Sequence, residues 1–152
     1  MDQEQPREIN TRLGKFLIQE DKCIHFPRGL IGMERFKDFV LLQIKADSPF
    51  YILQSLEDAN LGLMVADPFV FLQDYQVHLS SFEEEMLGIS SPEEAAIMVT
   101  VNIPPGRPEH TTLNLTGPIV LNSKKKLGLQ TVQAEPEKQK RINISELQIS
   151  TD

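Results

Sequence analysis

The stretch that decides the fold runs from Ser48 to Phe71 and reads SPFYILQSLEDANLGLMVADPFVF. It holds two apolar segments, 50–56 and 61–66, whose short length and aromatic and β-branched content favour strands over helices. The residues between them, 57–60, are Glu-Asp-Ala-Asn, and Asp and Asn side chains stabilise turns by bonding nearby backbone groups. The stretch therefore predicts a β-hairpin.

Both faces of the first segment carry apolar side chains, with Phe50 and Ile52 on one face and Tyr51 and Leu53 on the other. A strand that is apolar on both faces is covered on both sides and lies inside a sheet rather than at its edge. We therefore expect a central hairpin. Its buried residues are predicted to be Phe50, Ile52, Leu56, Leu63 and Val65.

The composition is that of an acidic globular protein. The 152 residues are 40% hydrophobic and carry a formal net charge of −7, which argues against a general nucleic-acid binder and against contact with anionic membranes. The single cysteine excludes an internal disulfide, as expected in a reducing compartment. We find no signal-peptide or membrane-spanning pattern. These features predict a cytoplasmic protein without direct nucleic-acid or membrane contacts.

The polarity of the chain predicts three regions. Residues 1–11 are polar and charged and are expected to form a flexible arm, whereas 12–133 are expected to form a single β domain. Residues 134–152 are expected to be a disordered polar tail, apart from a weakly apolar stretch at 142–149.

The remaining elements are short. Strands are predicted at 15–18, 23–26, 40–44, 75–79, 96–103, 111–121 with a kink at Gly117–Pro118, and 127–132. One or two helical turns are predicted at 33–39, and short capped helices are predicted after Ser80 and Ser91. The pattern predicts a mainly β fold, either a small β-barrel or a strongly bent antiparallel sheet with one or two short helices.

We find no catalytic pattern. Cys23 and His25 share one face of a predicted strand, but a zinc site needs two further ligands. Asp67 and Asp74 flank an aromatic segment without a nucleophile or base beside them, so structural or binding roles are favoured. We therefore expect no enzyme activity, no metal and no cofactor.

Charge is concentrated between Val77 and Thr112, where the sequence holds six carboxylates and one cation, a local net charge of −5. The carboxylates are Glu83, Glu84, Glu85, Glu93, Glu94 and Glu109. They can be a solvated helix face that complements the helix dipole, or an acidic patch that attracts a basic partner. The three lysines at 124–126 are interpreted as a charged turn rather than as an RNA site.

Several motifs, taken in order and spacing, resemble the FliW family of flagellar assembly factors over residues 11–133. They are Phe26-Pro-x-Gly29, Asp47-Ser-Pro-Phe50, Leu53-Gln-Ser55, Asp67-Pro-Phe69, and Asn114-Leu-x-x-Pro-Ile119 with Asn122. Two positions depart from the family pattern. Thr116-Gly117 stands where an apolar residue and alanine are usual, and Ile31 stands where proline is usual.

The resemblance implies a non-enzymatic cytoplasmic protein with two partners. One is flagellin before export, and the other is the translational repressor CsrA, which the family restrains so that flagellin synthesis follows secretion. The alternative is a chaperone-like module that binds flagellin and has no role towards CsrA. For CsrA the expected contacts are Glu83, Glu84 and Glu85; for flagellin they are Asp67, Pro68, Phe69 and Phe71.

Overall fold

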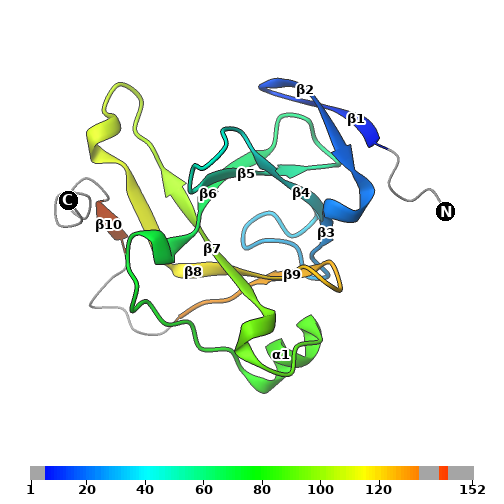
Figure 1. Ribbon diagram of the computed structural model, residues 1–152, viewed down its shortest axis with the longest axis vertical. Helices are drawn as coiled ribbons and strands as arrows, with labels where there is room; N and C mark the ends of the chain where they lie inside the picture. Colours follow the sequence, from blue (N-terminus) through cyan, green and yellow to red (C-terminus); the bar gives the residue numbers. More distant parts are fainter. Residues whose placement is uncertain (1–5, 134–140, 144–152) are drawn as a thin grey trace.

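The computed structural model describes residues 6–133 and 141–143, and its main body is a closed β-barrel (Figure 1). The barrel strands are β3 (Cys23–His25), β4 (Asp38–Gln43), β5 (Phe50–Ser55), β6 (Gly62–Ala66), β7 (Ala96–Asn102), β8 (Thr112–Asn122) and β9 (Leu127–Gln130). Their order around the barrel is β8-β7-β6-β5-β4-β3-β9, and β9 pairs back with β8 to close it. The mainly β fold predicted from the sequence is confirmed.

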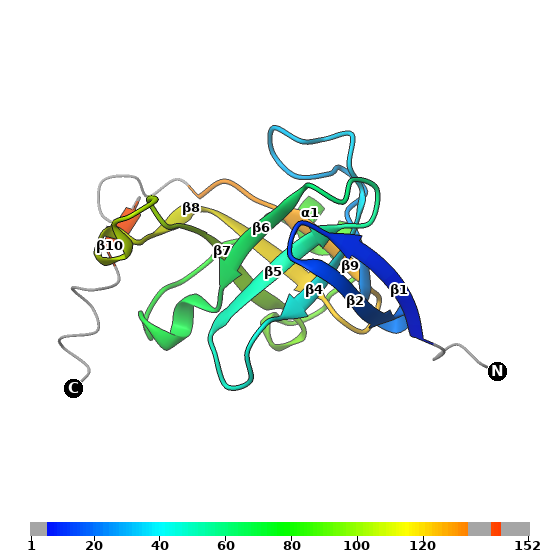
Figure 2. The same cartoon turned by 90° about the horizontal axis from the view of Figure 1, so that it is seen from above.

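A hairpin outside the barrel replaces part of the expected N-terminal arm. Strands β1 (Pro6–Thr11) and β2 (Gly14–Gln19) pair antiparallel as a separate two-stranded sheet. Figure 2 shows this hairpin lying over β4 and β5. Ile9 and Ile18 pack against Val40 and Leu42 of β4, so the prediction of a loose arm is wrong for this part of the chain.

The central hairpin forms as predicted, with β5 and β6 paired antiparallel. Val65 is buried, whereas Phe50, Ile52, Leu56 and Leu63 are half-buried. Part of the difference has a physical cause, because Ile52 and Leu56 face outwards and are covered only by the thin β1–β2 hairpin.

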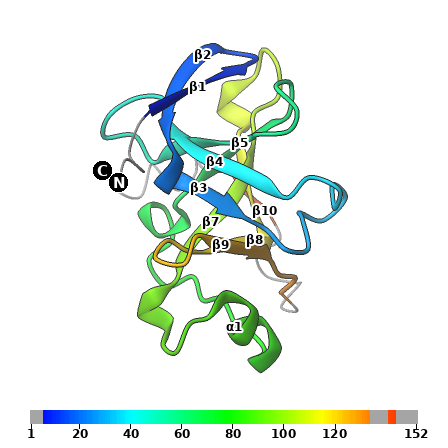
Figure 3. The same cartoon turned by 90° about the vertical axis from the view of Figure 1, so that its right-hand side faces the viewer.

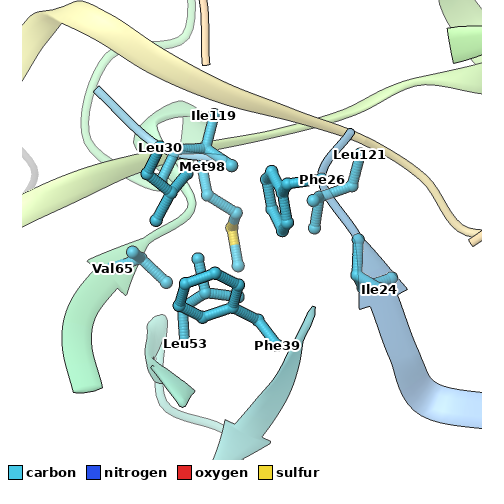
Figure 4. Packing of buried hydrophobic residues seen from close by; sticks show 9 residues of the cluster. All are labelled: Ile24, Phe26, Leu30, Phe39, Leu53, Val65, Met98, Ile119 and Leu121. Carbon is cyan, nitrogen blue, oxygen red and sulfur yellow. The ribbon is translucent and has the colours of Figure 1, made fainter. Parts of the chain in front are cut away.

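The barrel interior is filled by nine buried side chains from six strands and one loop (Figure 4). They are Ile24, Phe26, Leu30, Phe39, Leu53, Val65, Met98, Ile119 and Leu121. The rings of Phe26 and Phe39 meet edge to face, with centroids 5.4 Å apart. Phe26 and Leu30 belong to the loop between β3 and β4, which therefore covers one end of the barrel.

That loop contains tight turns instead of the predicted helix at 33–39. The Met33 N–H donates to the Leu30 oxygen and the Phe36 N–H donates to the Met33 oxygen, while Phe39 already belongs to β4. Successive turns of this kind place side chains three residues apart on one side, as a helical turn does. The spacing of the apolar residues was correct, but the helical interpretation was wrong.

β8 bends as the Gly117–Pro118 pair predicts. Between the pairs Thr100↔Asn114 and Met98↔Ile119 the register with β7 is irregular, so β8 carries extra residues there. The bend divides β8 into a part that pairs with β9 and a part that pairs with β10 (Arg141–Asn143). Arg141–Asn143 lies within the segment expected to be a tail, and that prediction fails for these three residues; 134–140 and 144–152 lie outside the described residues.

The helix α1 (Ser81–Leu87) lies against the outer side of β9 (Figure 3). Leu87 packs there with Val120 and Leu129, joined by Val77 and Leu79. The segment 75–79 alternates as a strand does but belongs to no strand.

The backbone of His78, within that segment, is held instead by a side chain. The Gln133 amide accepts from the His78 N–H at 2.8 Å and donates to its carbonyl oxygen at 3.0 Å. The burial of residues 75–79 alternates as predicted, but they pair with no described strand, so the predicted strand is wrong. Among the described residues, no helix has the length and apolar character needed to cross a membrane.

Candidate partner-binding surfaces

The first candidate surface is α1 with its three glutamates. Ser80 and Glu83 form the predicted capping box: the Ser80 hydroxyl accepts from the Glu83 N–H, and the Glu83 carboxylate accepts from the Ser80 N–H at 2.9 Å. Gly88 ends the helix in the left-handed conformation. Glu84 and Glu85 are exposed, so they are free to face a partner, whereas Glu83 has a structural role.

The carboxylates counted between 77 and 112 do not form one patch. Glu93 and Glu94 lie in η3 (Pro92–Glu94), close to α1 along the chain, but Glu109 lies in η4 (Pro108–His110). Figure 1 shows η4 in the loop between β7 and β8, at the opposite end of the molecule from α1. The local charge near the helix is therefore smaller than the sequence count.

A lysine-rich turn also borders the helix. The ammonium group of Lys125 donates to the Gly88 carbonyl oxygen at 3.0 Å, and it lies in the turn 124–126 that joins β8 to β9. A cation at a helix C-terminus complements the helix dipole. The turn thus places positive charge beside the acidic helix, a neighbourhood that the sequence alone does not show.

The second candidate surface is η2 (Pro68–Val70), at the end of β6. The Asp67 carboxylate caps it by accepting from the Phe69 N–H at 2.9 Å, and Pro68 is buried. Phe69 and Val70 are 38% and 54% exposed. Of the predicted contacts here, Phe69 presents an apolar face to solvent, while Asp67 and Pro68 shape the turn; Val70 was missed.

Aromatic packing of Phe71 and Tyr75 holds η2 in place. The Phe71 ring lies 6.0 Å from the Phe50 ring, and the Tyr75 ring lies 6.0 Å from the Phe69 ring. The Tyr75 hydroxyl donates to the Leu115 oxygen at 2.7 Å, and burial raises the pKa of Tyr75 to about 12. This packing fixes the position from which Phe69 and Val70 project.

The two candidate surfaces lie apart. In Figures 1 and 2, η2 at the end of β6 and α1 beside β9 occupy different parts of the molecule. Two ligands could therefore bind without sharing contact residues.

Two hollows in the surface correspond to no pattern in the sequence. A groove of about 380 Å³ lies between α1 and the β3–β4 loop, lined by residues that include Arg28, Ile31, Glu83 and Val132. A wider hollow of about 930 Å³ lies between the β1–β2 hairpin and the barrel strands. Both join segments that are distant along the chain, which no local pattern can reveal.

Cys23 and His25 do not gather further ligands. The His25 Nδ1 lies 2.8 Å from an Asp38 carboxylate oxygen, and burial together with Glu20 raises the pKa of the Cys23 thiol. Within residues 6–133 and 141–143, no group of three His, Cys, Asp or Glu side chains is arranged to hold a metal ion.

Comparison with known proteins decides the family. Residues 8–144 match the family model described as FliW protein. The chain belongs to the FliW family. The flagellar assembly factor FliW of Nitratidesulfovibrio vulgaris is 51% identical over 128 residues, which cover 84% of this chain and 74% of that protein. The flagellar assembly factor FliW of Thermotoga maritima is 37% identical over 136 residues, covering 90% and 91%.

A solved structure extends the likeness to three dimensions. A crystal structure of the flagellar assembly factor FliW superimposes with a TM-score of 0.82 at 31% identity, covering 91% of this chain and 96% of the other. The resemblance to FliW inferred from the sequence motifs is confirmed.

Two FliW motif residues maintain the fold in this chain. The Gln54 amide donates to the Asp58 and Ala59 oxygens and holds the β5–β6 turn. The Asn122 amide donates to the Leu87 oxygen at 2.8 Å and joins the end of β8 to α1. These two motif positions are explained by structure rather than by partner contact.

Proposed function

We propose that this protein is a cytoplasmic, non-enzymatic assembly factor that binds flagellin and antagonises CsrA, coupling flagellin synthesis to its export. Membership of the FliW family supports a role in flagellar assembly. The observation that carries the two-partner proposal is the presence of two separate exposed surfaces with different chemistry, one acidic at α1 and one apolar at η2.

CsrA is assigned to α1. Glu84 and Glu85 are exposed on one short helix, and a basic RNA-binding protein is attracted to such a surface. RNA is repelled by the same carboxylates, so binding here antagonises CsrA without contact between this protein and RNA. The lysine turn at 124–126 beside α1 offsets part of this attraction. Salt screens the remainder beyond the Debye length of about 8 Å at physiological ionic strength.

Flagellin is assigned to η2. Phe69 and Val70 are exposed apolar side chains on a turn held by the Asp67 cap and by the packing of Phe71. An amphipathic helix of a partner offers the apolar stripe that such a surface needs. Binding of this kind buries apolar area and depends less on salt than binding at α1.

The test of the CsrA surface is the double variant Glu84→Lys/Glu85→Lys, which leaves the Glu83 cap intact. We expect CsrA affinity, measured by calorimetry across a salt series, to fall at least tenfold and its salt dependence to flatten. The matched control reverses two exposed charges elsewhere, Glu8→Lys/Asp21→Lys, and is expected to bind CsrA normally. Full affinity in the α1 variant would show that these glutamates form only a solvated helix face.

The test of the flagellin surface is Phe69→Ala. We expect weaker flagellin binding and unchanged CsrA binding, with Leu17→Ala as the control for loss of an exposed apolar side chain, since Leu17 is 72% exposed on β2. The alternative of a chaperone-like flagellin binder is distinguished by a pull-down with CsrA in the absence of flagellin. Failure to retain CsrA there would favour that alternative.

A further inference from the structure

The barrel is closed by very little pairing on one side. β3 and β9 run parallel, and their register contains one residue pair, His25↔Leu127, with the His25 N–H donating to the Lys126 oxygen at 2.9 Å. Immediately afterwards the β3 chain turns away. Pro27 has no N–H to donate, and the Gly29 N–H donates to the Phe26 oxygen in a tight turn.

β9 continues past this point to Gln130, and no described strand pairs with its β3 side, although the Gln130 side chain accepts from the Ile31 N–H of the β3–β4 loop at 2.9 Å. The Thr131 N–H donates to the Pro118 oxygen of β8 at 3.0 Å, so Thr131 directs its backbone groups towards β8. Successive residues of a strand direct their N–H and C=O groups to opposite edges. Gln130 and Val132 therefore direct theirs to the β3 side, where no described strand pairs beyond Leu127.

This edge forms one side of the 380 Å³ groove. The residues 28–31 of the β3–β4 loop run along the other side, and α1 contributes Glu83. Exposed apolar side chains surround the opening: Ile31 is 52%, Phe82 60% and Val132 70% exposed. The Arg28 guanidinium lies 5.8 Å from the centre of the Phe82 ring, so it joins the β3–β4 loop to α1.

We propose that the groove binds an extended segment of a partner protein, which pairs with the backbone edge at Gln130, the last residue of β9, and at Val132 just beyond it. An edge strand offers N–H and C=O groups in a row, and another extended chain is the partner that satisfies them. The bound segment carries β-branched side chains at alternate positions, against Ile31 and Val132, and a basic side chain towards the Glu34 and Glu83 carboxylates.

The same charges explain why the edge does not pair indiscriminately. Short edges flanked by charged side chains resist self-association, and only a chain of complementary charge overcomes this barrier. Neither α1 residues 84 and 85 nor η2 take part, so the proposal stands independently of the surfaces assigned to CsrA and flagellin.

The probe is a capped five-residue peptide, Lys-Val-Lys-Val-Lys, titrated into the ¹⁵N-labelled protein. We expect amide shifts concentrated at Gln130 and Val132 and in the loop at 28–31. The same peptide with N-methylated valines keeps its charge and side chains but cannot pair its backbone fully, and we expect at least tenfold weaker binding. Equal binding of both peptides, shifts centred elsewhere, or no shifts at millimolar peptide would overturn the proposal.

Two protein variants sharpen the result. Val132→Pro removes an edge N–H and is expected to weaken peptide binding at least fivefold. Val132→Ala keeps the N–H and loses only part of an exposed side chain, so it is expected to retain most of the affinity. Equal effects of the two substitutions would show that the side chain, and not the backbone edge, binds the peptide.

Discussion

Gly29→Ala tests how tightly the β3–β4 loop is packed over the end of the barrel. Gly29 has a φ of +68°, and a Cβ added there would lie 2.5 Å from the Glu34 carbonyl oxygen and 2.6 Å from its Cα. The left-handed backbone alone costs roughly 1–2 kcal/mol for a residue with a side chain. Forcing the Glu34 backbone to move adds roughly 1–3 kcal/mol, typical of overpacking.

Gly32→Ala is the matched control in the same loop. Gly32 also has a positive φ, +86°, but an added Cβ meets nothing within 4 Å, so only the backbone cost of about 1–2 kcal/mol applies. The free energies of unfolding are compared by urea titration, with equal m-values required for both variants. Equal losses for Gly29→Ala and Gly32→Ala would refute the claim that residues 29–34 form a rigid cover.

The other predictions concern the core, one cap and the alkaline limit. Leu53→Ala, at a fully buried site, is expected to cost about 2–5 kcal/mol in urea unfolding, and Ile52→Ala is expected to cost less because the thin hairpin only half covers it. Asn122→Ala is expected to cost about 1–3 kcal/mol, since the buried Leu87 oxygen and the Lys124 N–H lose their partner. Asn122→Asp keeps the acceptor for the Lys124 N–H but sets a carboxylate oxygen against the Leu87 oxygen, so it is expected to cost at least as much. The raised pKa of Tyr75 implies stability that is fully present below pH 10 and is lost as the pH rises through about 12. The midpoint temperature of thermal unfolding, measured from pH 8 to 11, should therefore fall more steeply for the native protein than for Tyr75→Phe. Parallel curves of midpoint temperature against pH would contradict this.

The elements that the sequence predicted well are those whose cause is local. The β5–β6 hairpin follows from two apolar runs around a turn, and the Ser80–Glu83 capping box is complete within four residues. The bend in β8 follows in the same way from Gly117 and Pro118.

The elements that were missed depend on distant partners. β1 carries a single apolar residue that packs on the barrel, Ile9, because its other face is solvated, so its strand signal is weak. The 75–79 segment alternates like a strand, but its backbone is held at His78 by the Gln133 side chain, far along the sequence. At 33–39 the three-residue spacing belongs equally to a helical turn and to consecutive tight turns.

The candidate surfaces also divide into features with a local cause, which were predicted, and features that depend on distant segments, which were not. Phe69 was predicted from its place in an apolar motif and is exposed, and Glu84 and Glu85 are exposed as expected of a capped helix. The lysine turn beside α1 and the groove below the β3–β4 loop could not be predicted, because each brings together segments that only the closed barrel places side by side.

The single His25↔Leu127 pair also bears on when the barrel closes during folding. Loop-closure entropy grows with the length of chain that separates two contacts, so this pairing forms only after the β4–β5–β6 hairpins have shortened the effective loop. On the ribosome, β3 must wait until Leu127 has been synthesised before it finds its second neighbour. Closure of the barrel therefore waits for this seam, which borders the open edge of β9.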